Sequence, residues 1–167
     1  PEGGFFHHFL DDGTVYDDAT RHLVSSTRFV FNYARAFLHD GTDQHRDFAE
    51  HGLAYLRSHH QMPAIRQNLP GHFCWQLNDT DIEDARAMAY GHAFVMLAAA
   101  HGVRPEIDGA ADLLEESWQL MEELFWDADH SAYADERDQT LDILSPYRGQ
   151  NANMHAVEAL LAAYEST

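Results

Sequence analysis

The most informative segment of the chain is YRGQNANMHAVEA, residues 147–159. It predicts a helix that begins near Asn151 and runs to the end of the sequence. At 100° per residue, Asn151, His155 and Glu158 fall within about 60° of one another. One helix face is therefore expected to present an amide, an imidazole and a carboxylate, and the glutamate can fix the tautomer of the histidine. The alternative is an N-cap asparagine followed by a surface His–Glu pair, and spacing by itself favours that alternative.

A second face of the same helix is apolar, about 100° away, and we expect it to pack against the rest of the protein. Its members are Met154, Val157, Leu161 and Tyr164. The sequence ends inside this amphipathic pattern, so we expect the chain to be a piece of a longer protein.

Outward from this helix, the rest of the sequence reads as helix pairs separated by short extended loops. Further helices are expected at residues 21–39, 43–59, 82–101 and 107–126, a hairpin in the first 20 residues, and a short strand at 72–77. Helices that recur every ~30 to 50 residues are typical of a bundle, a solenoid or an α/α toroid. The predicted fold class is all-α, with short β-hairpins in the loops. We expect residues 1–167 to form one domain.

The composition excludes several classes of function. The 167 residues contain 28 acidic and 10 basic residues, for a net charge of −18, and every basic residue is arginine. This balance argues against binding to nucleic acid or to an anionic membrane, because phosphate contacts need a basic patch. No apolar run reaches the roughly 18 residues of a membrane helix, and the start lacks a signal-peptide pattern. Cys74 is the only cysteine, so no disulfide framework is expected. These features favour a cytoplasmic protein.

The first predicted helix carries Arg21, Arg28 and Arg35 on one face at heptad spacing. Arg28 precedes the apolar run 29–31, and a buried arginine needs an anion or several hydrogen-bond acceptors. Arg28 could therefore grip an oxygen-rich ligand. The alternative, favoured for Arg21 and Arg35, is a surface stripe paired with the abundant carboxylates.

Three further residues could either contact a ligand or pack in the core. Tyr90 could line a pocket or simply pack, and Trp75 could be a stacking platform for a sugar or a core tryptophan. His92 lies on an apolar helix face, which is more typical of a satisfied core histidine. The pairs His7–His8 and His59–His60 lack i,i+4 spacing with a further ligand, so no metal is expected.

Together these segments resemble the N-acylglucosamine 2-epimerase superfamily, and within it the aldose–ketose isomerase branch. The resemblance rests first on residues 147–159 and its Asn-Ala-Asn-Met-His string, which is specific. Weaker matches follow in the same order along the chain, namely GGFF at 3–6, DGTV at 12–15, STRF at 26–29 and AYGHAF at 89–94. Nearly the whole chain is covered.

The resemblance implies an (α/α)6 barrel of about 400 residues, of which this chain would be the N-terminal half. It implies a monosaccharide substrate, no cofactor and no metal. Enzymes of this kind open the sugar ring and move a proton between C1 and C2 through a cis-enediolate, with histidines as acid and base. That chemistry needs a base with a pKa near neutrality and donors aimed at the enediolate oxygen. Relatives are often dimers, which makes a homodimer the assembly to test.

By position, the resemblance implies that Arg28, Tyr90 and Asn151 bind substrate and that His155 assists ring opening or polarisation. His92 and Glu158 would contact these residues without touching the substrate. Trp75 is a further candidate for substrate binding. Many relatives have a tryptophan where this chain has Val24. The principal acid and base histidines of the family lie in the second half, so these 167 residues alone are expected to be inactive.

Four functions remain open from the sequence. The first is an aldose–ketose isomerase of the mannose-to-fructose type. The second is an N-acylglucosamine or cellobiose 2-epimerase of the same superfamily. The third is a non-catalytic carbohydrate-binding helical module. The fourth is an acidic helical domain with a structural role, in which Arg28, Tyr90 and His155 would not converge.

Overall fold

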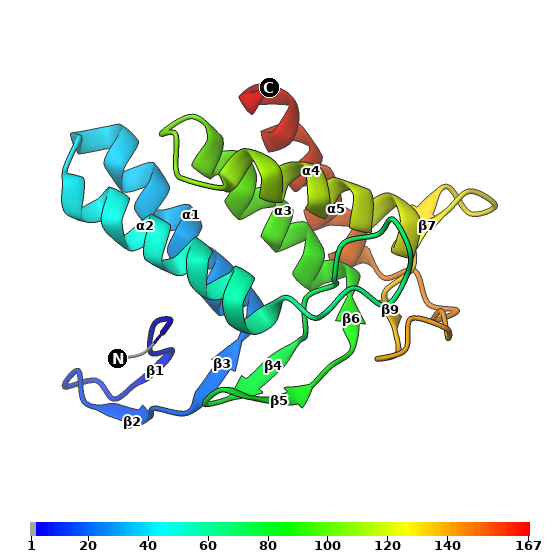
Figure 1. The fold of residues 1–167 in the computed structure, drawn as a ribbon, viewed down its shortest axis with the longest axis horizontal. Helices are drawn as coiled ribbons and strands as arrows, with labels where there is room; N and C mark the ends of the chain where they lie inside the picture. Colours follow the sequence, from blue (N-terminus) through cyan, green and yellow to red (C-terminus); the bar gives the residue numbers. More distant parts are fainter. Residues whose placement is uncertain (1–2) are drawn as a thin grey trace.

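The computed structural model describes residues 3–167, and its dominant elements are helices (Figure 1). They are α1 (Leu23–Asp40), α2 (Asp43–Tyr55), α3 (Ala89–Val103), α4 (Ala110–Leu120) and α5 (Gln150–Ser166). A π-helical turn extends α2 (η1, Leu56–His60) and another extends α4 (η2, Met121–Phe125). The predicted all-α class is confirmed.

The strands are short and lie in the connections between helices. β1 (His8–Phe9) pairs with β2 (Val15–Asp17), and β3 (Thr20–His22), β4 (Gln76–Asn78) and β5 (Asp81–Asp84) form an antiparallel sheet. β6 (Ala87–Met88) pairs with β9 (Glu136–Arg137), and β7 (Trp126–Asp127) with β8 (Ala132–Tyr133). The hairpin predicted in the first 20 residues is present, with Gly13 at a positive φ in its turn.

Helix α3 forms the centre of the core and packs against α1, α4 and α5. Twelve of its fifteen residues are buried, as expected for a helix that is apolar on every side. Gly91 lets α3 approach α1 closely, since a Cβ there would lie 2.7 Å from Leu23 and 3.1 Å from the Trp75 ring. The close approach places Trp75 beside the first turn of α3.

The first turns of α1, α3 and α5 lie at the same end of the molecule. The backbone N–H of Leu23, which begins α1, donates to the carbonyl of Trp75 at 3.0 Å. That of Ala89, which begins α3, donates to the carbonyl of Asp135 at 2.8 Å. The Asp135 carboxylate accepts from the N–H of Gly149, just before α5. In Figure 1, α1 and α3 rise from the end where β3 to β6 lie.

The third helix begins at Ala89, so the predicted start at Ile82 is wrong. Residues 81–84 instead form β5 and pair with β4. Asp79 adopts φ 58°, which reverses the chain in a two-residue turn, and Ile82 stays exposed. The chain before the predicted helix is therefore the turn of a β-hairpin.

Two other predicted boundaries shift for similar local reasons. The fourth helix begins at Ala110 and not at Ile107, because Glu106 and Gly109 adopt positive φ angles. The strand predicted at 72–77 is confined to β4, and Phe73 makes only an isolated bridge to Gln61.

The apolar stripe of α5 does not pack as predicted. Met154, Val157, Leu161 and Tyr164 are 49 to 83% exposed. The helix is instead buried through Ala152, Ala156 and Ala159, whose small side chains allow α5 to approach α3. Three residues of the stripe line an open groove of about 410 Å³ together with Phe31 and Leu97, namely Met154, Val157 and Leu161.

Candidate active site

Phe94 lies at the centre of a cluster formed by three helices. The Arg28 guanidinium of α1 stacks 5.0 Å from the centre of its ring, and the His155 imidazole of α5 lies 4.7 Å away. Tyr90, one turn earlier on α3, meets the His155 ring edge to face at 5.2 Å. Arg28, Tyr90 and His155 therefore converge, which the structural-domain alternative did not predict.

A cavity of about 290 Å³ opens between these helices. Its lining comprises Thr27, Arg28, Phe31 and Asn32 of α1, Phe94 and Leu97 of α3, and His155 and Glu158 of α5. The volume is at the small end for ligand sites. Polar donors and acceptors face an aromatic wall, which suits a small hydroxylated molecule.

His155 and Glu158 form a hydrogen-bonded pair on α5. The imidazole Nδ1 lies 2.7 Å from the Glu158 Oε2. A carboxylate only accepts, so Nδ1 carries the proton and the neutral ring keeps an acceptor at Nε2. The His155 side chain is 21% exposed and that of Glu158 is 54% exposed. The pair can therefore present an oriented base to the cavity.

Arg28 stands out because no neighbour among residues 3–167 neutralises its charge. Within residues 3–167 it makes no ion pair and no hydrogen bond, although the chain carries 28 acidic residues. Its stacking on Phe94 orients the guanidinium at a gain of about 0.5–1 kcal/mol. Five N–H donors thus remain available to a ligand oxygen.

A second, smaller cavity of about 190 Å³ lies on the other side of Arg28, bordered by His7, Ser25, Phe29 and Asn32. The His7 Nδ1 accepts the backbone N–H of His22 at 3.1 Å. Burial, and then the charge of Arg21, lower the pKa of His7 to about 4, so this imidazole is neutral at pH 7.

Sequence reasoning missed Asn32 and His7. Asn32 follows Arg28 by four residues, and that spacing could have placed it on the same face. His7 comes from the N-terminal hairpin, and nothing in its spacing relates it to α1.

Trp75 and Asn151 occupy the edge of the site. The half-buried Trp75 ring lies 4.2 Å from the His22 ring and 6.2 Å from the Tyr90 ring, both edge to face. It therefore supports Tyr90 and does not line the cavity beside His155. Asn151 is exposed in the first turn of α5, one turn before His155.

His92 is fully buried, and both of its ring nitrogens have partners. Nδ1 donates to the carbonyl of Met88 at 2.8 Å, and Nε2 accepts the N–H of Phe73 at 3.1 Å. Burial lowers its pKa to about 3. The geometry ties the loop before Trp75 to α3 and leaves no nitrogen for a substrate.

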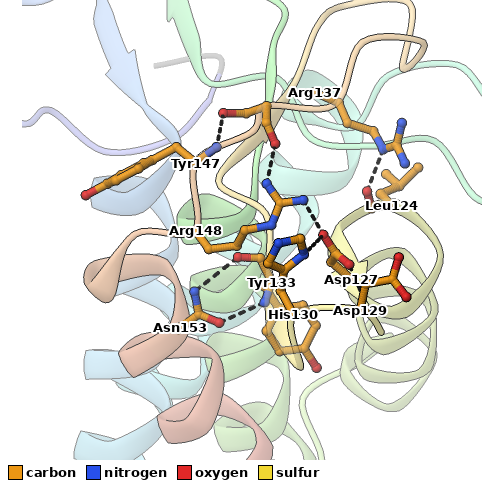
Figure 2. A network of polar contacts seen from close by, with 10 residues as sticks. Leu124, Asp127, Asp129, His130, Tyr133, Arg137, Tyr147, Arg148 and Asn153 are labelled. Carbon is orange, nitrogen blue, oxygen red and sulfur yellow. Dashed lines mark hydrogen bonds and ion pairs between the residues drawn. The ribbon is translucent and has the colours of Figure 1, made fainter.

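A polar network holds the start of α5 (Figure 2). The Asn153 amide accepts from the N–H of Tyr133 at 2.8 Å and donates to its carbonyl at 3.0 Å. Arg148 forms an ion pair with Asp127, which also bonds His130 at 2.9 Å. The Arg148 guanidinium lowers the pKa of the Asp127 carboxyl. Desolvation opposes this effect, His130 adds to it, and the pKa is lowered overall. Asn153 therefore has a structural role, whereas Asn151, two residues earlier, remains the candidate for substrate binding.

Across residues 3–167, no group of three or more His, Cys, Asp or Glu side chains is arranged to hold a metal ion. In the same residues, none of the helices combines the length and the apolar character that crossing a membrane requires.

Helix pairs with a cavity lined by α1, α3 and α5 define part of an (α/α)6 barrel. The fold matches a crystal structure of a D-mannose isomerase with a TM-score of 0.91 and 45% identity, over 100% of this chain and 42% of that one. It also matches the cellobiose 2-epimerase of Bacillus thermoamylovorans, with a TM-score of 0.87 and 18% identity, over 98% of this chain and 44% of that one.

Residues 4–167 match the family model of N-acylglucosamine 2-epimerase, and the chain belongs to that family. A D-mannose isomerase of Marinomonas mediterranea is 44% identical over all 167 residues. This chain spans 41% of the length of that relative.

Proposed function

We propose that the chain forms the N-terminal part of an aldose–ketose isomerase that interconverts mannose and fructose. The observation that carries the proposal is the convergence of Arg28, Tyr90 and His155 around Phe94, beside a cavity that Arg28 and His155 line. The 44% identity to a D-mannose isomerase supports the choice of sugar. Because the chain spans 41% of that relative, activity is proposed for the complete polypeptide that carries these residues.

In the proposed reaction, a proton moves between C1 and C2 of the open-chain sugar through a cis-enediolate, without a metal. The Arg28 guanidinium donates to the O1 and O2 oxygens, where negative charge develops. The His155 Nε2 accepts or donates a proton at O1 or the ring oxygen, and Glu158 holds the imidazole in the required tautomer.

Tyr90 and Asn151 bind substrate hydroxyls in this scheme, and Trp75 supports Tyr90 from the side. The principal acid and base are expected beyond residue 167. Residues 1–167 alone would therefore contribute binding and polarisation without completing the proton transfer. A cytoplasmic location and a homodimer complete the proposal. Sedimentation of the complete protein measures the oligomeric state.

The test is an isomerisation assay on the complete protein with mannose, in which fructose formation is followed by chromatography. His155→Ala is expected to lose most of the rate. His39→Ala, which changes an exposed histidine in the last turn of α1, serves as the matched control. Turnover of mannose together with loss in the His155 variant alone supports the proposal.

Other outcomes separate the alternatives. Epimerisation of cellobiose or of an N-acyl sugar, without action on mannose, would keep the family and overturn the branch. Sugar binding without any conversion would favour the binding module, and absence of both would overturn the site itself.

A further inference from the structure

One loop residue is hydrogen-bonded to the starts of α3 and α5, the helices that carry Tyr90 and His155. Asp135 lies between β8 and β9, and its carbonyl accepts the N–H of Ala89, the first residue of α3, at 2.8 Å. Its carboxylate Oδ1 accepts the N–H of Gly149, at the start of α5, at 2.5 Å. Its own N–H donates to the carbonyl of Tyr147 at 3.0 Å.

The two helices held at their starts by Asp135 carry Tyr90 and His155. Tyr90 follows Ala89 directly, and His155 lies in the second turn after Gly149. The two rings meet at 5.2 Å. A displacement of α5 at Gly149 would therefore change the position of His155 relative to Tyr90.

Gly149 gives independent evidence that the contact with Asp135 is tight. A Cβ at this position would lie 2.8 Å and 2.9 Å from the two carboxylate oxygens of Asp135 and 2.7 Å from the Tyr147 ring. The φ of Gly149 is −71°, which any residue adopts. The site therefore requires glycine for the close approach of Asp135 and not for its backbone conformation.

The loop segment that contains Asp135 makes a second contact with α5. Two residues before Asp135, both backbone groups of Tyr133 bond the side chain of Asn153 (Figure 2). Asn153 also donates to the carbonyl of Gly149 at 2.9 Å. Residues 133–135 thus contact the start of α5 at two points, Gly149 and Asn153.

We propose that Asp135 is a positioning residue that sets His155 against Tyr90 by coupling the starts of α3 and α5. The proposal rests on the proposed function, since it assigns its effect to the rate of sugar isomerisation. A misplacement of about 1 Å at a reacting group can lower a rate by about 100-fold.

The test uses Asp135→Ala and Asp135→Asn in the complete protein, assayed with mannose well below the melting temperature. The alanine variant loses the acceptor for Gly149, so kcat is expected to fall about 10- to 100-fold, with a smaller change in KM. Asparagine keeps an acceptor oxygen and is expected to recover kcat to within about threefold of the wild type. Gly149→Ala, which crowds the same contact, is expected to lower kcat as Asp135→Ala does.

Asp138→Ala is the matched control. The Asp138 carboxylate accepts the N–H groups of Asp142 and Ile143 in the neighbouring loop, away from the helix starts. Its loss should lower stability without lowering kcat. Equal kcat losses in Asp135→Ala and Asp138→Ala, or no rescue by asparagine, would overturn the proposal.

A second readout does not depend on activity. Amide hydrogen exchange at residues 149–153 should accelerate at least about tenfold in Asp135→Ala, while exchange in α2 stays unchanged. If the wild type proves inert on mannose, the proposed function fails. The coupling is then decided by exchange and by the Tyr90–His155 ring contact in NMR, and unchanged values of both would overturn it.

Discussion

The imidazole Nδ1 of His155 lies 2.7 Å from the carboxylate Oε2 of Glu158, one turn further along α5. The pair is formed within one helix, so it does not depend on the packing of other elements. It orients the imidazole and leaves Nε2 outside the pair, and His155 lines the same cavity as Arg28. The functional consequence of this contact can be separated from its effect on stability.

Replacing Glu158 with Gln is expected to lower kcat about tenfold, because the neutral amide orients and polarises the imidazole less strongly. The melting temperature should change by less than about 2 °C, since exposed i,i+3 pairs contribute only about 0.2–0.5 kcal/mol. Steady-state kinetics and calorimetry check both. Glu165→Gln, an exposed glutamate on the same helix, should leave kcat unchanged, and a wild-type kcat in Glu158→Gln would contradict a role for the pair.

Arg28→Lys is expected to raise KM for the sugar about tenfold. Lysine keeps the charge but loses the planar fork of donors and its stacking on Phe94. Stability should hardly change, because Arg28 is exposed and makes no ion pair within the described residues. Arg35→Lys, two turns further along α1, is the control, and an unaltered KM in Arg28→Lys would remove Arg28 from the binding site.

Much of the helical layout could be predicted from the sequence, because apolar periodicity and breakers such as Gly41 act locally. The start of α3 could not, since residues 81–84 gain their partner only when β4 is in place. The prediction that the apolar stripe of α5 is buried was wrong, because a local pattern was present but the packing did not follow it. Its large residues fit a buried face by pattern, whereas the alanines beside them allow the closer packing.

The candidate site divides in the same way. The face shared by Asn151, His155 and Glu158 follows from spacing along one helix. The meeting of Arg28, Tyr90 and His155 at Phe94 requires three helices and could be placed only through the family resemblance. His7 and Asp135 reach the site region from loops far away in sequence, and no local pattern marks either.

Cys74 is expected to resist thiol reagents in the native protein. Burial raises its pKa to about 12, so almost no thiolate is present at pH 7. The peptide that contains Cys74 should remain unlabelled after an hour with a maleimide and label fully in urea, as measured by mass spectrometry. Labelling of this peptide within minutes under native conditions would show that the segment before Trp75 opens readily.

Stability is expected to fall as the pH is lowered below about 6.5, because burial lowers the pKa of several histidines, among them His60 and His92. Burial lowers the pKa of His60 to about 4 and that of His92 to about 3, against 6.5 for an unperturbed histidine. Between pH 6.5 and 4 the unfolded chain binds protons that the folded chain does not. Each histidine therefore removes up to about 1.4 kcal/mol of unfolding free energy per pH unit, and its full contribution is present above pH 6.5.

Urea unfolding at pH 7, 6 and 5 measures this slope, and His60→Gln isolates one contribution. The variant loses a ring that bonds the Cys74 carbonyl and the Ser26 hydroxyl, so it should be less stable at pH 7. Its stability should nevertheless fall less steeply with acid, because one proton fewer is taken up on unfolding. His39→Gln, at an exposed site, should reproduce the wild-type slope. An equal slope in His60→Gln would mean that His60 is protonated in the folded protein.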